Sequence, residues 1–186
     1  MTLADVLPVR VLLLPGWQNS APSHWQSRWE ALHGYRRVEQ DDWLWPKRGD
    51  WMARLDEVLL QAEMPAVFVA HSLGCQLVAA WSAHSQHTAR VKAALLVAPP
   101  DPEREDTPPQ LYNWRPIMRE YLPFASLVVT SSDDPYASPE RVAAMAADWG
   151  SDSATIGARG HINGNSGLGY WPEGHAMLRT LIKLAV

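Results

Sequence analysis

The sequence contains a single cysteine, Cys75, among its 186 residues. An internal disulfide framework is therefore excluded. The sequence also lacks any cluster of lysine and arginine, and its formal net charge is −4. Nucleic acids and anionic membrane surfaces are therefore not expected as partners.

Long apolar runs are missing as well. No stretch approaches the length of a membrane span. The apolar start at residues 9–14 is too short for the hydrophobic region of a signal peptide, because Pro15-Gly16 ends it and no cleavage site follows. We therefore expect a cytoplasmic protein. At this length and with 47% hydrophobic residues, we expect one domain over residues 1–186, large enough to bury a core without disulfides or metals.

Short apolar runs alternate with amphipathic segments along the chain. The runs predict strands at residues 10–14, 35–39, 66–70, 91–98, 125–131 and 153–156. Helices are expected at 24–32 behind a Ser23 cap, at 51–63 behind an Asp50 cap, at 73–83 and at 139–149. Pro172-Glu173-Gly174 leads into a last helix, which is expected to begin at His175 and to end near Leu184. In the first helix, Trp25, Trp29 and Leu32 are expected to share the inward face. This order predicts an α/β fold, with a mostly parallel sheet covered by helices on both faces.

The stretch at residues 70–75 reads Ala-His-Ser-Leu-Gly-Cys and joins an apolar strand to a helix rich in Ala and Leu. Small residues at Ala70 and Gly74 let the helix turn close against the strand, so that Ser72 is held up into a cleft. The pattern is typical of a nucleophilic serine. The alternative is that Ser72 only caps the helix.

A nucleophilic serine needs a base, and the base needs a group that orients it. Asp133 and Asp134 follow one later strand, and His161 follows the next, in the order serine, acid, histidine. Asp134 is the preferred acid because it precedes Pro135, with Asp133 as a stabiliser of the loop. The backbone N–H groups of Trp17 and Leu73 are the candidate donors to a developing oxyanion.

Two other residues near the turn have reactive side chains but are expected to have structural roles. His71 is expected to support the turn, and Cys75 to be an inert packing residue. No metal-ligand spacing is found, and no Gly-x-Gly-x-x-Gly follows the first strand, so neither a metal nor a dinucleotide cofactor is expected.

Four motifs together resemble the small serine hydrolases that include retinoblastoma-binding protein 9 and bacterial YdeN, which belong to the α/β-hydrolase superfamily. They are Leu-Pro-Gly-Trp at 14–17, Ala-His-Ser-Leu-Gly-Cys at 70–75, Ser-Ser-Asp-Asp-Pro-Tyr at 131–136 and Gly-His-Ile-Asn at 160–163. The resemblance implies a compact fold with a minimal lid or none, in which Ser72, Asp134 and His161 are the catalytic residues. The Leu-x-Cys-x-Glu motif for retinoblastoma protein is absent, so that partner is not expected.

The predicted reaction is hydrolysis of a small ester or amide through an acyl-enzyme. Trp17, His24 and Trp171 are the candidate substrate-binding residues. Further tryptophans at 25, 43, 45 and 114 either line the rim or pack the core. Two alternatives remain open, a catalytically idle binding protein on the same fold and an acyltransferase that uses the same three residues.

Overall fold

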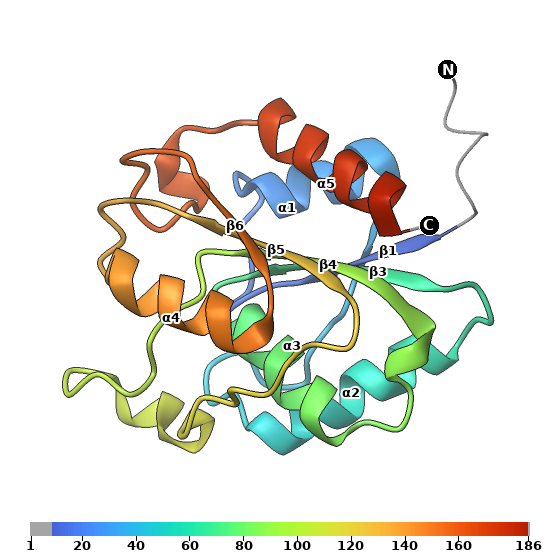
Figure 1. Cartoon of the computed structure of the whole chain (residues 1–186), viewed down its shortest axis with the longest axis horizontal. Helices are drawn as coiled ribbons and strands as arrows, with labels where there is room; N and C mark the ends of the chain where they lie inside the picture. Colours follow the sequence, from blue (N-terminus) through green and yellow to red (C-terminus); the bar gives the residue numbers. More distant parts are fainter. Residues whose placement is uncertain (1–8, 186) are drawn as a thin grey trace.

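A six-stranded parallel sheet forms the centre of the computed structural model, which describes residues 9–185 (Figure 1). The strand order is β2-β1-β3-β4-β5-β6. The strands are β1 (Arg10–Leu14), β2 (Arg36–Arg37), β3 (Ala66–His71), β4 (Val91–Val97), β5 (Ala125–Thr130) and β6 (Asp152–Thr155). The strand order reverses between β1 and β3, and such a switch point leaves a crevice beyond the carboxyl ends of the strands.

Helices cover both faces of the sheet, which confirms the predicted α/β fold (Figure 1). On one face lie α1 (Trp25–His33) and α5 (Pro172–Ala185). On the other lie α2 (Arg48–Leu60), α3 (Leu73–His84) and α4 (Pro139–Trp149). The connections also contain the short 3-10 helices η2 (Thr88–Arg90), η3 (Pro109–Trp114) and η4 (Gly164–Ser166). None of the helices in residues 9–185 has the length and apolar character needed to cross a bilayer.

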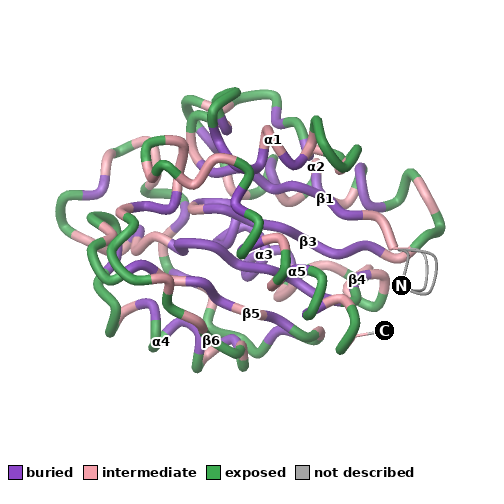
Figure 2. Tube along the Cα trace, turned by 90° about the horizontal axis from the view of Figure 1, so that it is seen from above, coloured by how far each residue is buried: buried purple, intermediate pink, exposed green. Residues whose placement is uncertain are grey.

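The central strands are apolar throughout because each supplies both faces of the sheet. In β3, Val67 and Val69 pack beneath α1 and α5, whereas Phe68 and Ala70 pack beneath α2 and α3. This alternation follows from the period of two along a strand. Figure 2 shows the central strands buried along their length, with the exposed residues gathered in the loops and outer helices.

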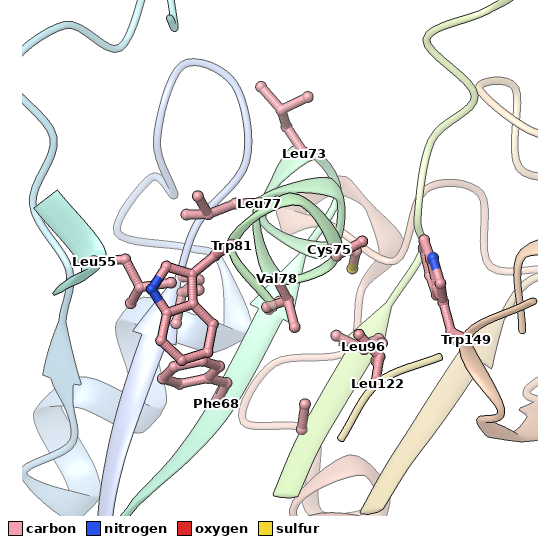
Figure 3. Close-up of a cluster of buried hydrophobic side chains, with 14 of the residues drawn as sticks. Leu55, Phe68, Leu73, Cys75, Leu77, Val78, Trp81, Leu96, Leu122 and Trp149 are labelled. Carbon is pink, nitrogen blue, oxygen red and sulfur yellow. The ribbon is translucent and has the colours of Figure 1, made fainter. Parts of the chain in front are cut away.

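Aromatic packing anchors α3 on the strand that delivers Ser72. Trp81 contacts Phe68 edge to face, with ring centroids 5.3 Å apart, and Leu55 of α2 lies beside them (Figure 3). The Trp81 indole N–H donates to Asp56 Oδ1 at 2.7 Å. The helix is therefore fixed relative to β3, which gives the turn between them a rigid support.

The predicted Asp50 cap of α2 is wrong. The helix begins at Arg48 and ends at Leu60, before the predicted end at residue 63. Its Arg48 N–H donates to Asn113 Oδ1 at 2.8 Å, and the neighbouring Trp114 indole N–H donates to Pro46 O at 2.8 Å. A segment 65 residues away thus sets the start of the helix, which no local pattern could reveal.

The first helix also departs from its prediction. His24, not Ser23, is the N-cap, and its Nδ1 accepts from the Gln26 N–H at 3.1 Å. The Gln26 amide is buried and donates to carbonyls of Leu14 and Val69. The buried face of α1 is therefore turned towards Gln26, and Leu32 is 60% exposed instead of buried.

The second strand is shorter than the predicted 35–39. It contains only two residues, which pair with Leu12 and Leu13 of β1. β2 lies at the edge of the sheet, and the Val38 N–H just beyond it still donates to Leu13 O at 2.9 Å.

Candidate active site

Ser72 occupies a sharp turn between β3 and α3. Its backbone has φ 55° and ψ −125°, a region that side-chain-bearing residues rarely adopt. The Ser72 N–H donates to Val97 O of β4 at 2.9 Å, which holds this conformation in place. Such strain is typical of a nucleophile turn that points its hydroxyl away from the sheet.

Two glycines allow the chain to close around this turn. A Cβ added at Gly74 would lie 2.2 Å from Leu14 O, and one added at Gly16 would lie 2.7 Å from Ser72 Cβ. At these distances the added carbon would clash with its neighbour. The predicted role of Gly74 in the approach of helix to strand therefore fits the structure, and Gly16 has a matching role in the loop after β1.

The His161 ring lies between Ser72 and Asp134. Nε2 is 2.7 Å from Ser72 Oγ, and Nδ1 is 2.9 Å from Asp134 Oδ2 and 3.0 Å from Oδ1. The side chains of Asp134 and His161 are 2% and 9% exposed. Since a carboxylate only accepts hydrogen bonds, Nδ1 carries the proton and Nε2 is left to accept from the serine hydroxyl.

Asp133 holds the loop that carries the histidine, which we name the base loop (residues 157–163). Its Oδ1 accepts from the Ser131 hydroxyl at 2.8 Å and from the Gly160 N–H at 2.7 Å. The Ser131 hydroxyl and then the Gly160 N–H lower the pKa of the Asp133 carboxyl. The hydroxyl in turn accepts from the Arg159 N–H at 2.9 Å. Asp133 thus joins the loops that carry Asp134 and His161.

The two predicted oxyanion donors are the backbone N–H groups of Leu73, which follows Ser72, and Trp17, which follows Gly16. The Gly16 Cβ position is 3.2 Å from the Leu73 nitrogen, which brings the loop after β1 against the start of α3. Within residues 9–185 neither N–H donates to a protein acceptor. Both are therefore free to bind an oxygen next to the serine.

A cleft of about 1050 Å³ opens over these residues. Its apolar lining comes from Trp17, Leu73, Leu111 and prolines, and its polar lining includes Ser20, Asn163 and Asn165. At the rim, Arg104 pairs with Asp106, with Nε 2.9 Å from Oδ1. The charges of Arg104 and Asp106 therefore offset one another at this rim, and the third charged lining residue, Asp101, pairs with Arg141.

The structure separates the three candidate substrate-binding residues. Trp17 and His24 line the cleft, but Trp171 does not. Trp171 is 2% exposed and packs with Trp25 and Trp29 in the core beneath α1 and α5. The prediction that Trp171 binds substrate is therefore wrong. Of the tryptophans proposed for the rim, Trp25 and Trp114 are also buried, whereas Trp45 is 56% exposed, so only part of this set packs the core.

His24 is neutral at the floor of the cleft. Burial, followed by the charges of Arg37 and His161, lowers the pKa of His24 to about 3. Its Nδ1 accepts from the helix, so the proton is on Nε2, which is buried without a hydrogen-bond partner. His24 therefore offers a cap to α1 but no charge to a substrate.

Two contacts of His161 were missed from the sequence. The Tyr136 ring lies 4.6 Å from the His161 ring and lines the cleft. Its place directly after Asp134-Pro135 was the signal, because the loop that carries Asp134 continues through it. His71 is expected to pack beside the turn or to support it, and its Nε2 also lies 2.9 Å from His161 O. No local sequence pattern predicts that contact.

Cys75 is buried. Burial raises the pKa of its thiol well above the usual value, and Sγ donates to Val97 O at 3.4 Å. It does not supply a thiolate. In residues 9–185, no three His, Cys, Asp or Glu side chains come together in a way that could hold a metal ion.

Comparison with known proteins agrees with this geometry. A family model described as "Serine hydrolase" matches residues 11–180. No curated protein matches the chain.

Solved structures with the same fold are numerous. A protein described as a YdeN-like hydrolase from Pectobacterium atrosepticum superposes with a TM-score of 0.84 at 26% identity, covering 96% of this chain and 92% of that chain. The ydeN gene product of Bacillus subtilis gives 0.73 at 18% identity, covering 95% and 100%. A thermophilic esterase from Thermogutta terrifontis gives 0.65 at 16% identity, covering 97% and 92%.

Proposed function

The chain belongs to the serine hydrolase family, and on that premise we propose that it cleaves a small, uncharged ester or amide through Ser72, His161 and Asp134. The observation that carries the proposal is the unbroken chain of hydrogen bonds from Ser72 Oγ through the His161 ring to Asp134. A serine hydroxyl is a weak nucleophile by itself, and this arrangement is the one that activates it.

In the first step, His161 Nε2 takes the proton of the Ser72 hydroxyl while Oγ attacks the substrate carbonyl. Asp134 holds the ring in the tautomer that can accept this proton, and it stabilises the imidazolium that forms. The carbonyl oxygen becomes negative and is bound by the N–H groups of Trp17 and Leu73. Because Leu73 is the first residue of α3, the helix dipole adds to this attraction.

In the second step, the imidazolium returns its proton to the leaving oxygen or nitrogen, and an ester between Ser72 and the acyl group remains. Water then attacks this ester. His161 takes a proton from the water and gives it to Ser72 Oγ, which restores the enzyme. These steps require no cofactor.

The cleft supports a substrate without net charge. The apolar lining suits a short acyl group. Asn163 and Asn165 line the polar side of the cleft and lie on the loop that follows His161. The leaving group must approach His161 to receive its proton, so we place the more polar part of the substrate on that side. An ester or amide with a short apolar acyl group and a polar leaving group fits both halves.

The test is labelling by a fluorophosphonate probe together with hydrolysis of a panel of p-nitrophenyl esters and aminoacyl arylamides. The wild type is expected to be labelled and to turn over short esters or amides, and Ser72→Ala is expected to lose both activities. Ser132→Ala is a matched control, because Ser132 is an exposed serine that does not line the cleft. Full labelling of Ser72→Ala would contradict the proposal.

A further inference from the structure

Two successive carbonyls of the base loop are bound by ring N–H groups from other elements. His71 Nε2 lies 2.9 Å from His161 O, and Trp25 Nε1 donates to Ile162 O at 2.8 Å. His71 ends β3, directly before Ser72, and Trp25 begins α1. The base loop is thus joined to the turn of the nucleophile and to a helix on one face of the sheet.

The donor in the first contact is fixed by chemistry. A carbonyl oxygen only accepts, so His71 must carry its proton on Nε2. His71 is 5% exposed, and burial lowers its pKa well below the usual value, which leaves the ring neutral. Trp25 is 1% exposed, and an indole nitrogen is always a donor. Both bonds therefore lie in a buried setting, where loss of one partner leaves the other unsatisfied.

The backbone between these bonds is strained. Ile162 has φ 49°, which is rare for a β-branched residue. Such a conformation persists only when the surroundings hold it. The two bonds lie on either side of it, at the carbonyls of His161 and Ile162, and Ile162 itself is fully buried.

We propose that His71 and Trp25 are positioning residues, which hold the strained backbone at His161 and Ile162 so that the His161 ring stays within reach of Ser72. This inference rests on the proposed function of those two residues. The two donors differ in origin but act at one place. Loss of either lets the backbone at Ile162 relax, which moves the His161 ring relative to Ser72 Oγ.

The ring contacts support this role. The His71 ring lies 4.9 Å from the His161 ring and 4.6 Å from His24, while Trp25 contacts His71 at 6.0 Å. The donors and the base therefore form one packed group. Asp134 alone cannot fix the ring, because it orients Nδ1 and leaves the backbone of the base loop free.

A pair of variants at residue 71 tests the hydrogen bond. Gln places a side-chain N–H close to the position of the imidazole Nε2, and Met has a similar length without a donor. We expect kcat to fall by about 10- to 100-fold in His71→Met, as for a catalytic group displaced by about 1 Å. We expect His71→Gln to keep most of the wild-type kcat and KM to change little in both. Equal kcat values for the two variants would overturn the role of His71.

A second pair separates positioning from stability. Trp25→Phe removes the donor to Ile162 O, whereas Trp29→Phe removes a similar indole bond from the same helix, to Tyr170 O at 2.6 Å. Both variants are expected to unfold at lower temperature. Only Trp25→Phe is expected to lose kcat and the rate of fluorophosphonate labelling, measured well below the unfolding temperature. An equal loss in both, or in neither, would overturn the role of Trp25.

Labelling of the wild type distinguishes failure of the proposed function from failure of the positioning roles. If it shows no labelling that depends on Ser72, the proposed function fails, and the positioning roles fail with it. If it is active and the variants behave alike within each pair, only the positioning inference fails.

Discussion

Asp133 and Asp134 are neighbours in the chain, yet their carboxyl groups hold different parts of the base loop. Asp134 Oδ2 lies 2.9 Å from His161 Nδ1, whereas Asp133 Oδ1 accepts from the Gly160 N–H at 2.7 Å. One carboxyl orients the ring and the other supports the backbone beneath it. Their substitutions should therefore have different effects.

We predict that Asp134→Asn lowers kcat by on the order of 10³- to 10⁴-fold, because an amide can turn its NH₂ group to His161 and favour the wrong tautomer. Asp133→Asn keeps the oxygen that accepts from Gly160, so a much smaller loss is expected. Steady-state kinetics on one ester substrate compares the two variants. Similar losses at both positions would contradict the assignment of Asp134 as the acid.

Gly16→Ala is predicted to abolish most of the activity. The new methyl group would lie 2.7 Å from Ser72 Cβ and 3.2 Å from the Leu73 nitrogen, so the loop that carries the Trp17 N–H must move. Loss of one oxyanion donor costs about 100-fold or more in turnover. Gly49→Ala is the control, because a Cβ there meets nothing within 4 Å. It lies in α2 and should raise the free energy of unfolding by about 0.5–1 kcal/mol with kcat unchanged.

We predict that the free energy of unfolding falls as the pH decreases from neutral towards 4. The pKa of His24 is about 3 in the folded chain, against 6.5 for the free side chain. The unfolded chain therefore binds a proton that the folded chain does not, and stability is lost as the pH drops below 6.5. At pH 5 this amounts to about 2 kcal/mol for one such group.

His24→Asn isolates this effect, since asparagine can still cap α1 but does not titrate. Urea unfolding at neutral pH and at about pH 5 should show a smaller decrease for the variant than for the wild type. An equal decrease would mean that His24 is not neutral in the folded chain.

Cys75 is predicted to be unreactive in the folded protein. Burial raises the pKa of its thiol, so the thiolate that reacts with iodoacetamide is scarce at neutral pH. Mass spectrometry should find no alkylation of the native protein and full alkylation in urea. Cys75→Ala should keep the wild-type kcat, and alkylation that inactivates the native enzyme would contradict both expectations.

The parts of the site that could be predicted are those fixed by local sequence. The turn at Ser72 follows from small residues between an apolar strand and a helix. A parallel sheet places the residues that follow its strands at one edge, which brings Ser72, Asp134 and His161 together. The predicted ends of the central strands also lie within a residue of the observed ends, because buried strands are continuous apolar runs.

The parts that failed depend on contacts between distant residues. The start of α2 depends on Asn113, and the exposed position of Leu32 depends on the bonds of Gln26 to two strands. Trp171 resembled a rim residue because it lies in a glycine-rich loop, but it packs against Trp25 and Trp29. The partners that bury Trp171 lie on α1, about 140 residues earlier in the chain, and the sequence alone does not show that contact.

The hydrogen bonds of Asn113 and Trp114 have a consequence for redesign of the cleft. These residues lie in η3 in the connection between β4 and β5, and they fix the start of α2 through Arg48 and Pro46. Exchange of the whole connection, as in grafting a larger lid, would loosen a core helix. Random mutagenesis for new substrates is better confined to residues 104–108, which line the cleft at Arg104, Asp106, Thr107 and Pro108 and precede η3. The selectivity of the enzyme can then change while its scaffold stays intact.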